Sequence, residues 1–228
     1  MYDLLIRNAE LLDGTGQPAY RGDIAVEQGR ITAIGDLSTA DAQRTIDADG
    51  HIACPGFIDS HTHSDLTIAL DGRALSSLAQ GITTQVMGNC GVSAAPTRDF
   101  EPYHGPLDPA MTRDLRCDWE HFEDYFHRLE AQGLGTNTAT LVGHGNIRVA
   151  AMGYDDRPPT PAEMERMKGL TARAMEDGAL GLSSGLAYAP GPYAALDELV
   201  ELGKVIGEYN GIYTSHIRNQ TESIAEAV

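Results

Sequence analysis

Short apolar segments alternate with helical patterns from Pro55 onward, and this alternation limits the possible folds more than any other feature of the 228-residue chain. The expected strands are GFIDSHTHSD, GITTQVMGNCG, NTATLVGHGN, ALGLSSGL and IYTSHIRN. Parallel strands need a long crossover, usually a helix, and such crossovers are right-handed. The pattern therefore predicts an α/β protein with a parallel sheet, built from five strand–helix units.

Several segments between these strands carry helix signals. WEHFEDYFHRLEAQG places apolar and aromatic residues on one face at helical spacing. PAEMERMKGLTARAMEDG follows Thr160, a good N-cap, and has Pro161 at the first helical position. We also expect helices around residues 72–80, over LDELVELGKVIGEYNG, and in TESIAEAV. A long insertion, rich in proline and charged residues, runs over residues 92–118.

Residues 1–54 differ from the rest because their apolar runs pair with Gly- and Asp-rich turns, without a helix signal. Residues 24–35 predict a hairpin with its turn at Gln28 and Gly29. The chain thus divides into a small β unit, residues 1–54, and an α/β unit, residues 55–228.

Charge and cysteine content exclude several classes of protein. The chain has 33 acidic and 16 basic residues, a net charge of −17, which argues against nucleic acid and anionic membranes as partners. Its three cysteines form no CxxC pair, so reduced thiols or a metal ligand fit better than disulfides. The N-terminus lacks the basic and apolar regions of a signal peptide, and no apolar run is long enough to span a membrane. We expect a soluble cytoplasmic protein.

The segment Asp59-Ser60-His61-Thr62-His63 is the strongest local signal for chemistry. Alternate residues of a strand share a face, so His61 and His63 project together from the carboxyl end of the first expected α/β strand. Barrel enzymes keep their active sites at that end, and neutral imidazoles bind zinc. The alternative is a pair of surface histidines in a turn. We favour a metal site, in which Asp59 either orients a ligand or caps the strand end.

Three further residues follow later strands. Cys90 lies between Gly88 and Gly91, and His216 ends the fifth strand, so both can join the histidine pair as metal ligands. Their alternatives are a small buried hydrophobe for Cys90 and a structural histidine for His216. His144 ends the third strand and is a candidate catalytic residue that could orient substrate, polarise a carbonyl or hydrogen-bond a loop.

Lysine is scarce, with only Lys168 and Lys204 present, both on expected helices. A carboxylated lysine on the fourth strand, which bridges two metals in some barrel hydrolases, is therefore disfavoured, and Cys90 is the candidate bridging ligand.

Several segments together resemble the D-aminoacylase (N-acyl-D-amino-acid deacylase) family of the amidohydrolase superfamily. They are YDLLIRNAELLDGTG, PGFIDSHTHSD, GITTQVMGNCGVS, LVGHGNIR, GALGLSSGLAYAPG and NGIYTSHIRNQ. The resemblance implies a small β-sandwich, part of it in residues 1–54, beside a metal-bearing (β/α)₈ barrel whose first five units occupy residues 55–228. It implies that Cys90 and His216 hold a tight Zn²⁺, and that His61 and His63 hold a second, weaker metal with Cys90 able to bridge.

The resemblance also implies what lies outside this chain. A further histidine ligand, the catalytic general acid/base aspartate and the residues that bind the substrate carboxylate are expected beyond residue 228. The chain resembles about the first half of such an enzyme, so we expect it to need the C-terminal half of the barrel and to be poorly stable alone, because an incomplete barrel exposes sheet edges.

The implied activity is zinc-dependent hydrolysis of the amide bond of small-molecule N-acyl-D-amino acids, giving a carboxylate and a free D-amino acid. Two alternatives stay open. One is another amidohydrolase, a cyclic amidase or dipeptidase; the other is a catalytically inactive metal-binding fragment that lacks the general acid/base. A nucleotide-binding protein is disfavoured because neither a GxGxxG segment after the first strand nor a P-loop is present.

Overall fold

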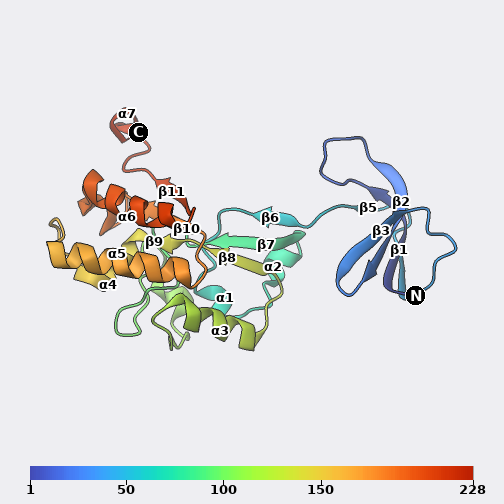
Figure 1. Cartoon of the computed structure of the whole chain (residues 1–228), viewed down its shortest axis with the longest axis horizontal. Helices are drawn as coiled ribbons and strands as arrows, with labels where there is room; N and C mark the ends of the chain where they lie inside the picture. The colour runs from blue at the N-terminus through green and yellow to red at the C-terminus, as the bar shows by residue number, and fades with distance from the viewer. Residues whose placement is uncertain (228) are drawn as a thin grey trace. The chain divides into compact units, whose positions relative to one another are not determined.

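The computed structural model describes residues 1–227 and contains two compact units, Met1–Gly56 and Phe57–Val228. The first unit, drawn in blue in Figure 1, is a five-stranded sheet. In it β3, β2, β1 and β4 are neighbours in that order, and β5 also pairs with β1. Its strands are β1 (Tyr2–Leu11), β2 (Tyr20–Glu27), β3 (Arg30–Gly35), β4 (Ala42–Asp47) and β5 (Ile52–Ala53). One face buries Leu5, Ala9, Leu11 and Ala25.

The predicted hairpin is the antiparallel pair β2–β3. Gln28 and Gly29 connect the strands with φ of +53° and +72°, the conformation that two-residue hairpin turns favour because its twist matches the strands. The sequence signal at this turn is therefore confirmed.

The second unit contains parallel strands that follow one another in chain order. They are β6 (Phe57–Asp59), β7 (Ile82–Met87), β8 (Asn137–Thr140), β9 (Val142–Gly143), β10 (Gly181–Gly185) and β11 (Ile212–His216). The order β6-β7-β8 continues as β9-β10-β11, since β8 and β9 are parts of one extended segment on either side of Leu141. The N–H of Leu141 donates to the Met87 carbonyl at 3.0 Å, so the segment stays hydrogen-bonded to β7. This gives the five predicted strand positions.

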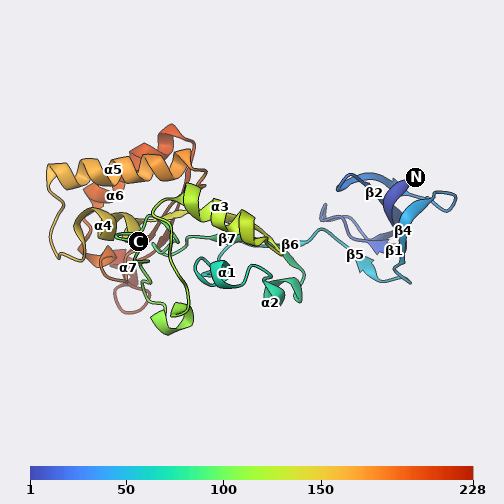
Figure 2. The ribbon, with the colours of Figure 1, turned by 90° about the horizontal axis from the view of Figure 1, so that it is seen from below.

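Helices lie between these strands. They are α1 (Thr67–Leu70), α2 (Leu75–Leu78), α3 (Phe122–Gln132), α4 (His144–Met152), α5 (Pro161–Glu176), α6 (Leu196–Glu208) and α7 (Ile224–Ala227), with 3₁₀ turns at Pro109–Thr112 and Gly191–Tyr193. Helix α5 contacts both α4 and α6, and Figure 2 shows the same three helices from below. None of the helices among residues 1–227 is long and apolar enough to cross a membrane.

Three elements differ most from the sequence-based prediction. The first expected α/β strand ends at Asp59, so His61 and His63 lie in the loop after β6 and not in the strand. The helix expected around residues 72–80 is reduced to α2, a single turn. The third strand was predicted to continue to Asn146, but it ends at Gly143 and α4 begins at His144. The extended backbone of Gly143 serves as the helix N-cap, so strand and helix join without a loop.

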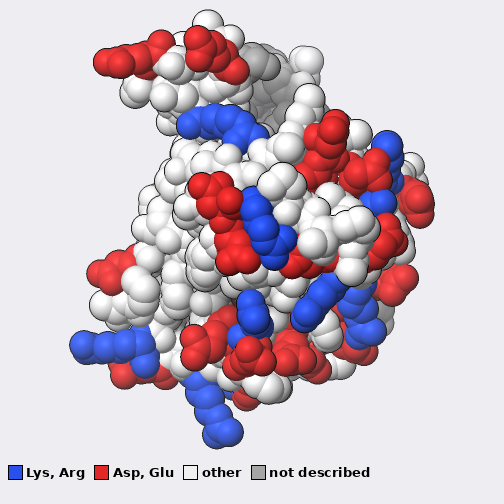
Figure 3. All heavy atoms as spheres, turned by 90° about the vertical axis from the view of Figure 1, so that its left-hand side faces the viewer, with Lys and Arg blue, Asp and Glu red and all other residues white. Residues whose placement is uncertain are grey.

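The core of the second unit is built on the predicted aromatic stripe. Trp119, Phe122, Tyr125 and Leu129 are buried against side chains of the sheet and of α5 and α6. The Tyr125 hydroxyl donates to the Asp65 carbonyl at 2.6 Å, which ties α3 to the loop after β6. On the face shown in Figure 3, acidic and basic side chains are intermingled.

Candidate metal centre

The two histidines of the HTH segment and Cys90 come together where β6 and β7 end. His61 and His63 follow β6, and Cys90 follows the neighbouring β7. One potential ligand atom from each residue lies within 4.8 Å of the others, and Cys90 Sγ is 3.3 Å from His61 Nε2. The rings of His61 and His63 meet edge to face, with centroids 5.3 Å apart. Two imidazoles and one thiol around a point are a donor set suited to zinc.

Cys90 occupies a turn with unusual backbone geometry. Its φ is +54°, and Gly88 and Gly91 beside it have φ of +76° and +75°. A residue with a Cβ normally avoids this left-handed region, so the surrounding structure must hold Cys90 there. A Cβ on Gly88 would overlap the backbone of Leu141, and one on Gly91 would overlap that of Gly185. The glycines therefore let the turn rest directly on the neighbouring strand ends.

His216 lies on the wall of the same cavity. It is the last residue of β11 and, with His61 and Cys90, lines a hollow of about 380 Å³. Tyr188 packs edge to face on its ring, with centroids 4.7 Å apart, and the tyrosine hydroxyl is 3.3 Å from each ring nitrogen. The close cluster comprises His61, His63 and Cys90, so three of the four predicted ligands converge, and the fourth, His216, lines a cavity with His61 and Cys90.

Burial sets the protonation preferences of these groups. Desolvation lowers the pKa of His63, and the nearby His61 and His216 lower it further. Desolvation also raises the pKa of the Cys90 thiol. A neutral imidazole can donate its lone pair to a metal, whereas the thiol must lose its proton on binding one. His63 Nδ1 is buried without a hydrogen-bond partner among the described residues. A zinc ion satisfies such an orphaned nitrogen, so the residues fit this metal.

The side chains of Asp59, Lys168 and Lys204 contact protein groups other than the clustered imidazoles and thiol. Asp59 Oδ1 accepts a hydrogen bond from the His61 backbone N–H at 3.1 Å, which is the contact of a strand-end cap. Lys168 lies on α5 and Lys204 on α6, and both pair with Glu201, at 2.7 and 2.5 Å. Neither lysine lies on β10, the strand where a carboxylated lysine would be needed.

The chain matches a family model described as "Amidohydrolase family" over residues 44–214. This chain belongs to the amidohydrolase family. It is 38% identical over 227 residues to the D-aminoacylase of Alcaligenes xylosoxydans xylosoxydans, and 43% identical over 229 residues to the N-acyl-D-glutamate deacylase of the same organism. These alignments cover 100% and 99% of this chain but 46% of each relative. The chain thus spans less than half the length of the curated relatives it matches.

A solved structure gives the same relationship. The N-acyl-D-glutamate deacylase from Bordetella bronchiseptica, complexed with zinc and a phosphonate inhibitor that mimics the tetrahedral intermediate, is 41% identical and has a TM-score of 0.90. The match covers 99% of this chain and 47% of that one. The resemblance drawn from the sequence motifs and the predicted metal-dependent hydrolase fold are therefore confirmed.

His144 of this amidohydrolase-family chain is fully buried at the start of α4. Its Nε2 lies 2.7 Å from Glu198 Oε1, and the other oxygen of Glu198 accepts from Arg148 at 2.5 Å. Arg148 also donates to the carbonyls of Asp155 and Arg157, at 3.1 and 2.8 Å. The three charged or polar side chains join α4 to the first turn of α6. The catalytic role predicted for His144 stays a prediction.

Two buried polar residues beside the centre were missed by the sequence analysis. Asp65 Oδ1 accepts from the Gly88 N–H at 2.7 Å, and burial raises the pKa of this carboxyl to about 7. Ser183 bonds to the Cys90 turn from β10. The available signals were an acid two residues after His63 and two adjacent serines in an expected strand.

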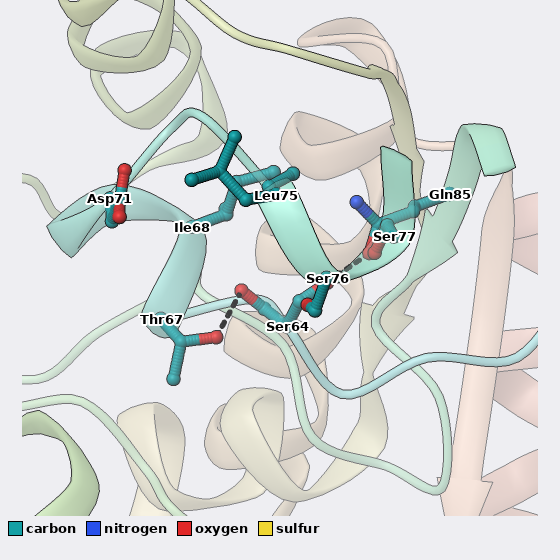
Figure 4. A pocket seen from close by; sticks show the side chains of 9 residues that line it. Ser64, Thr67, Ile68, Asp71, Leu75, Ser76, Ser77 and Gln85 are labelled. Carbon is teal, nitrogen blue, oxygen red and sulfur yellow. Dashed lines mark hydrogen bonds between the residues drawn. The ribbon is translucent and has the colours of Figure 1, made fainter. Parts of the chain in front are cut away.

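A second hollow adjoins the loop after His63 but offers different chemistry. It has a volume of about 270 Å³ and is lined by hydroxyl groups of Ser64, Thr67 and neighbouring serines (Figure 4). Ser64 donates to Gln85 Oε1 at 2.9 Å. The carboxylate in its lining, Asp71, is paired with Arg73 at 2.7 Å. This hollow therefore lacks the imidazole and thiol donors of the Cys90 cavity.

Proposed function

We propose that this chain carries the metal-binding part of a zinc-dependent N-acyl-D-amino-acid deacylase. The reaction is hydrolysis of the amide bond of a small-molecule N-acyl-D-amino acid to a carboxylate and a free D-amino acid. One observation carries the proposal: Cys90 converges with His61 and His63 within 4.8 Å, in a chain 38–43% identical to D-amino-acid deacylases. We assign residues 1–54 to part of the small β-sandwich and residues 55–228 to the incomplete barrel.

The proposed ligands divide between two positions. Cys90 and His216 hold the tight zinc, and His61 and His63 hold a second, weaker metal. Cys90 Sγ lies 3.3 Å from His61 Nε2, beside a ligand of the second position, so Cys90 would be the ligand shared by the two positions. When bound, zinc acts as a Lewis acid on the amide carbonyl and lowers the pKa of a bound water.

The chain's own residues prepare the centre in this proposal. The Tyr188 hydroxyl, 3.3 Å from the ring nitrogens of His216, orients that imidazole. For His144, full burial and the Glu198 contact favour a structural hydrogen bond, made here to helix α6 and not to a loop, over contact with substrate. The general acid/base aspartate and the groups that bind the substrate carboxylate come from outside residues 1–228, in the C-terminal half of the barrel.

Zinc content tests the ligand assignment. We expect the purified chain to retain stoichiometric zinc after dialysis and the Cys90→Ala variant to lose it, because the variant removes the thiolate. Cys54→Ala is the matched control, since Cys54 is an exposed cysteine of the other unit. Stoichiometric zinc in Cys90→Ala, measured by mass spectrometry of the metal, would contradict the assignment.

A substrate panel tests the reaction. The chain is assayed alone and co-expressed with the C-terminal half of the 43% identical N-acyl-D-glutamate deacylase. We expect release of D-glutamate, D-aspartate or D-leucine from the N-acetyl compounds in the co-expressed sample, with the L-enantiomers left intact. Preferential turnover of a hydantoin or a dipeptide would favour another amidohydrolase. Zinc binding without turnover in both samples would favour an inactive metal-binding fragment.

A further inference from the structure

A single buried hydroxyl bonds to both sides of Cys90. Ser183 lies in β10 and has no exposed surface. Its Oγ donates to the carbonyl of Gly88 and accepts from the N–H of Gly91 at 2.9 Å. A serine hydroxyl has one donor and two acceptor sites, so Ser183 can make both bonds at once. The two backbone groups that it satisfies flank the residue whose thiol faces His61.

The same turn is fixed from two other directions. Asp65, in the loop that carries His63, accepts the Gly88 N–H at 2.7 Å. The Gly91 carbonyl accepts from the N–H of Gly145, at the start of α4, at 3.0 Å. Gly185 of β10 has no room for a Cβ, because the Cys90 carbonyl lies against it. Three neighbouring elements therefore determine where the turn runs.

We propose that Ser183 is a positioning residue for the metal centre, holding the Cys90 turn so that the thiolate and the imidazoles meet at one point. This inference rests on the proposed function, which makes Cys90 a metal ligand. Ser183 does not itself contact the metal or substrate in this proposal; it acts through the backbone on either side of the cysteine.

The physical argument lies in the geometry of the turn. Cys90 is held at φ +54°, a conformation that a residue with a Cβ keeps only when its surroundings impose it. Removing the Ser183 hydroxyl leaves the Gly88 carbonyl and the Gly91 N–H without that partner in a buried site, which favours a rearranged turn. A rearranged turn displaces Sγ from its position 3.3 Å from His61 Nε2.

Cobalt binding provides a test that does not depend on activity. Co²⁺ replaces zinc at such sites, and a bound thiolate gives a ligand-to-metal charge-transfer band. We expect Ser183→Ala to bind Co²⁺ about tenfold or more weakly than the wild type, as loss of a group that orients a ligand commonly does, and to show a weaker thiolate band. We expect Ser183→Thr, which keeps the hydroxyl, to restore both.

Ser184→Ala is the matched control. Ser184 is the adjacent residue of the same strand and is equally buried, but its hydroxyl bonds to Tyr213 and Ser215, at 2.6 and 2.8 Å. The control removes the same atom from the same strand without touching the Cys90 turn, so its cobalt affinity and band should match the wild type. Thermal melting of each variant separates a change at the centre from loss of the fold.

The outcomes separate this inference from the proposed function. A normal thiolate band and affinity in folded Ser183→Ala would overturn the inference while leaving Cys90 as a ligand. A wild type without a thiolate band would overturn both. If Ser183→Ala fails to fold, Ser183→Thr decides: a retained band supports the role of the hydroxyl, and a lost band in a folded protein contradicts it.

Discussion

The buried carboxyl of Asp65 shows that a residue that positions the Cys90 turn can also lower the stability of the fold. Its Oδ1 accepts the Gly88 N–H, while its Oδ2 is buried without a partner among the described residues. An ionised carboxylate is costly in such surroundings, and burial raises the pKa of Asp65 to about 7. The residue that helps to hold the Cys90 turn is therefore also a source of pH-dependent stability.

Asp65 should make the metal-free chain less stable as pH rises. An unburied Asp has a pKa of 3.8, so between that value and about 7 the folded chain holds a proton that the unfolded chain has lost. Stability from this residue is greatest below pH 3.8, falls through the window and is constant above about 7. Urea unfolding across this range should show Asp65→Asn losing less stability than the wild type. Parallel pH profiles for the two proteins would contradict the assignment.

The sequence predicted the residues that carry chemistry better than those that hold them. His61, His63 and Cys90 were recognised because imidazoles and a thiol follow adjacent strands of a parallel sheet. Ser183 was missed because its contact with Gly88 joins residues 95 positions apart. No local pattern of residues encodes such a pairing.

Helix α5 and the β9–α4 junction show what a local signal can and cannot predict at the scale of elements. Thr160 and Pro161 marked the start of α5 from sequence alone, and the structure begins the helix there. The start of α4 was missed because Gly143, a residue without a side chain to cap a helix, joins β9 to α4 without a loop. Loopless junctions leave little sequence signal to mark the boundary.

The start of α5 should depend on its capping box. Thr160 Oγ1 accepts from the Glu163 N–H at 3.3 Å, and Glu163 Oε2 accepts from the Thr160 N–H at 2.7 Å. Thr160→Ala should therefore lower the free energy of unfolding by about 1 kcal/mol, as measured by urea denaturation. Thr160→Ser keeps the hydroxyl and should stay close to the wild type. An equal change in the free energy of unfolding in both variants would show that the Thr160 hydroxyl does not stabilise the start of the helix.

At the scale of the whole molecule, the parallel sheet has apolar side chains on both outer strands. In β6, Phe57 is 59% and Ile58 67% exposed, and in β11, Ile212 is 52% exposed. The β6 and β11 strands each pair with one neighbour, so each leaves an edge open. The sequence predicted the parallel sheet and its open edges, but which apolar side chains are exposed on the edge strands emerged only from the three-dimensional arrangement.

These edges predict that the chain alone is poorly stable or self-associating, because open apolar strands pair with other chains. We expect light scattering coupled to gel filtration to detect species larger than the 24.4 kDa monomer. Co-expression with the C-terminal half of a relative should reduce that association. A soluble monomer with a cooperative melting transition would contradict this expectation.

The environment of bound zinc tests the central claim, that Cys90 and histidines of this chain form a metal centre. X-ray absorption at the zinc edge of the zinc-loaded chain reports the elements bound to the metal. The account predicts a sulfur ligand together with imidazole nitrogens, and loss of the sulfur signal in Cys90→Ala. A zinc environment of nitrogen and oxygen alone in the wild-type chain would contradict it.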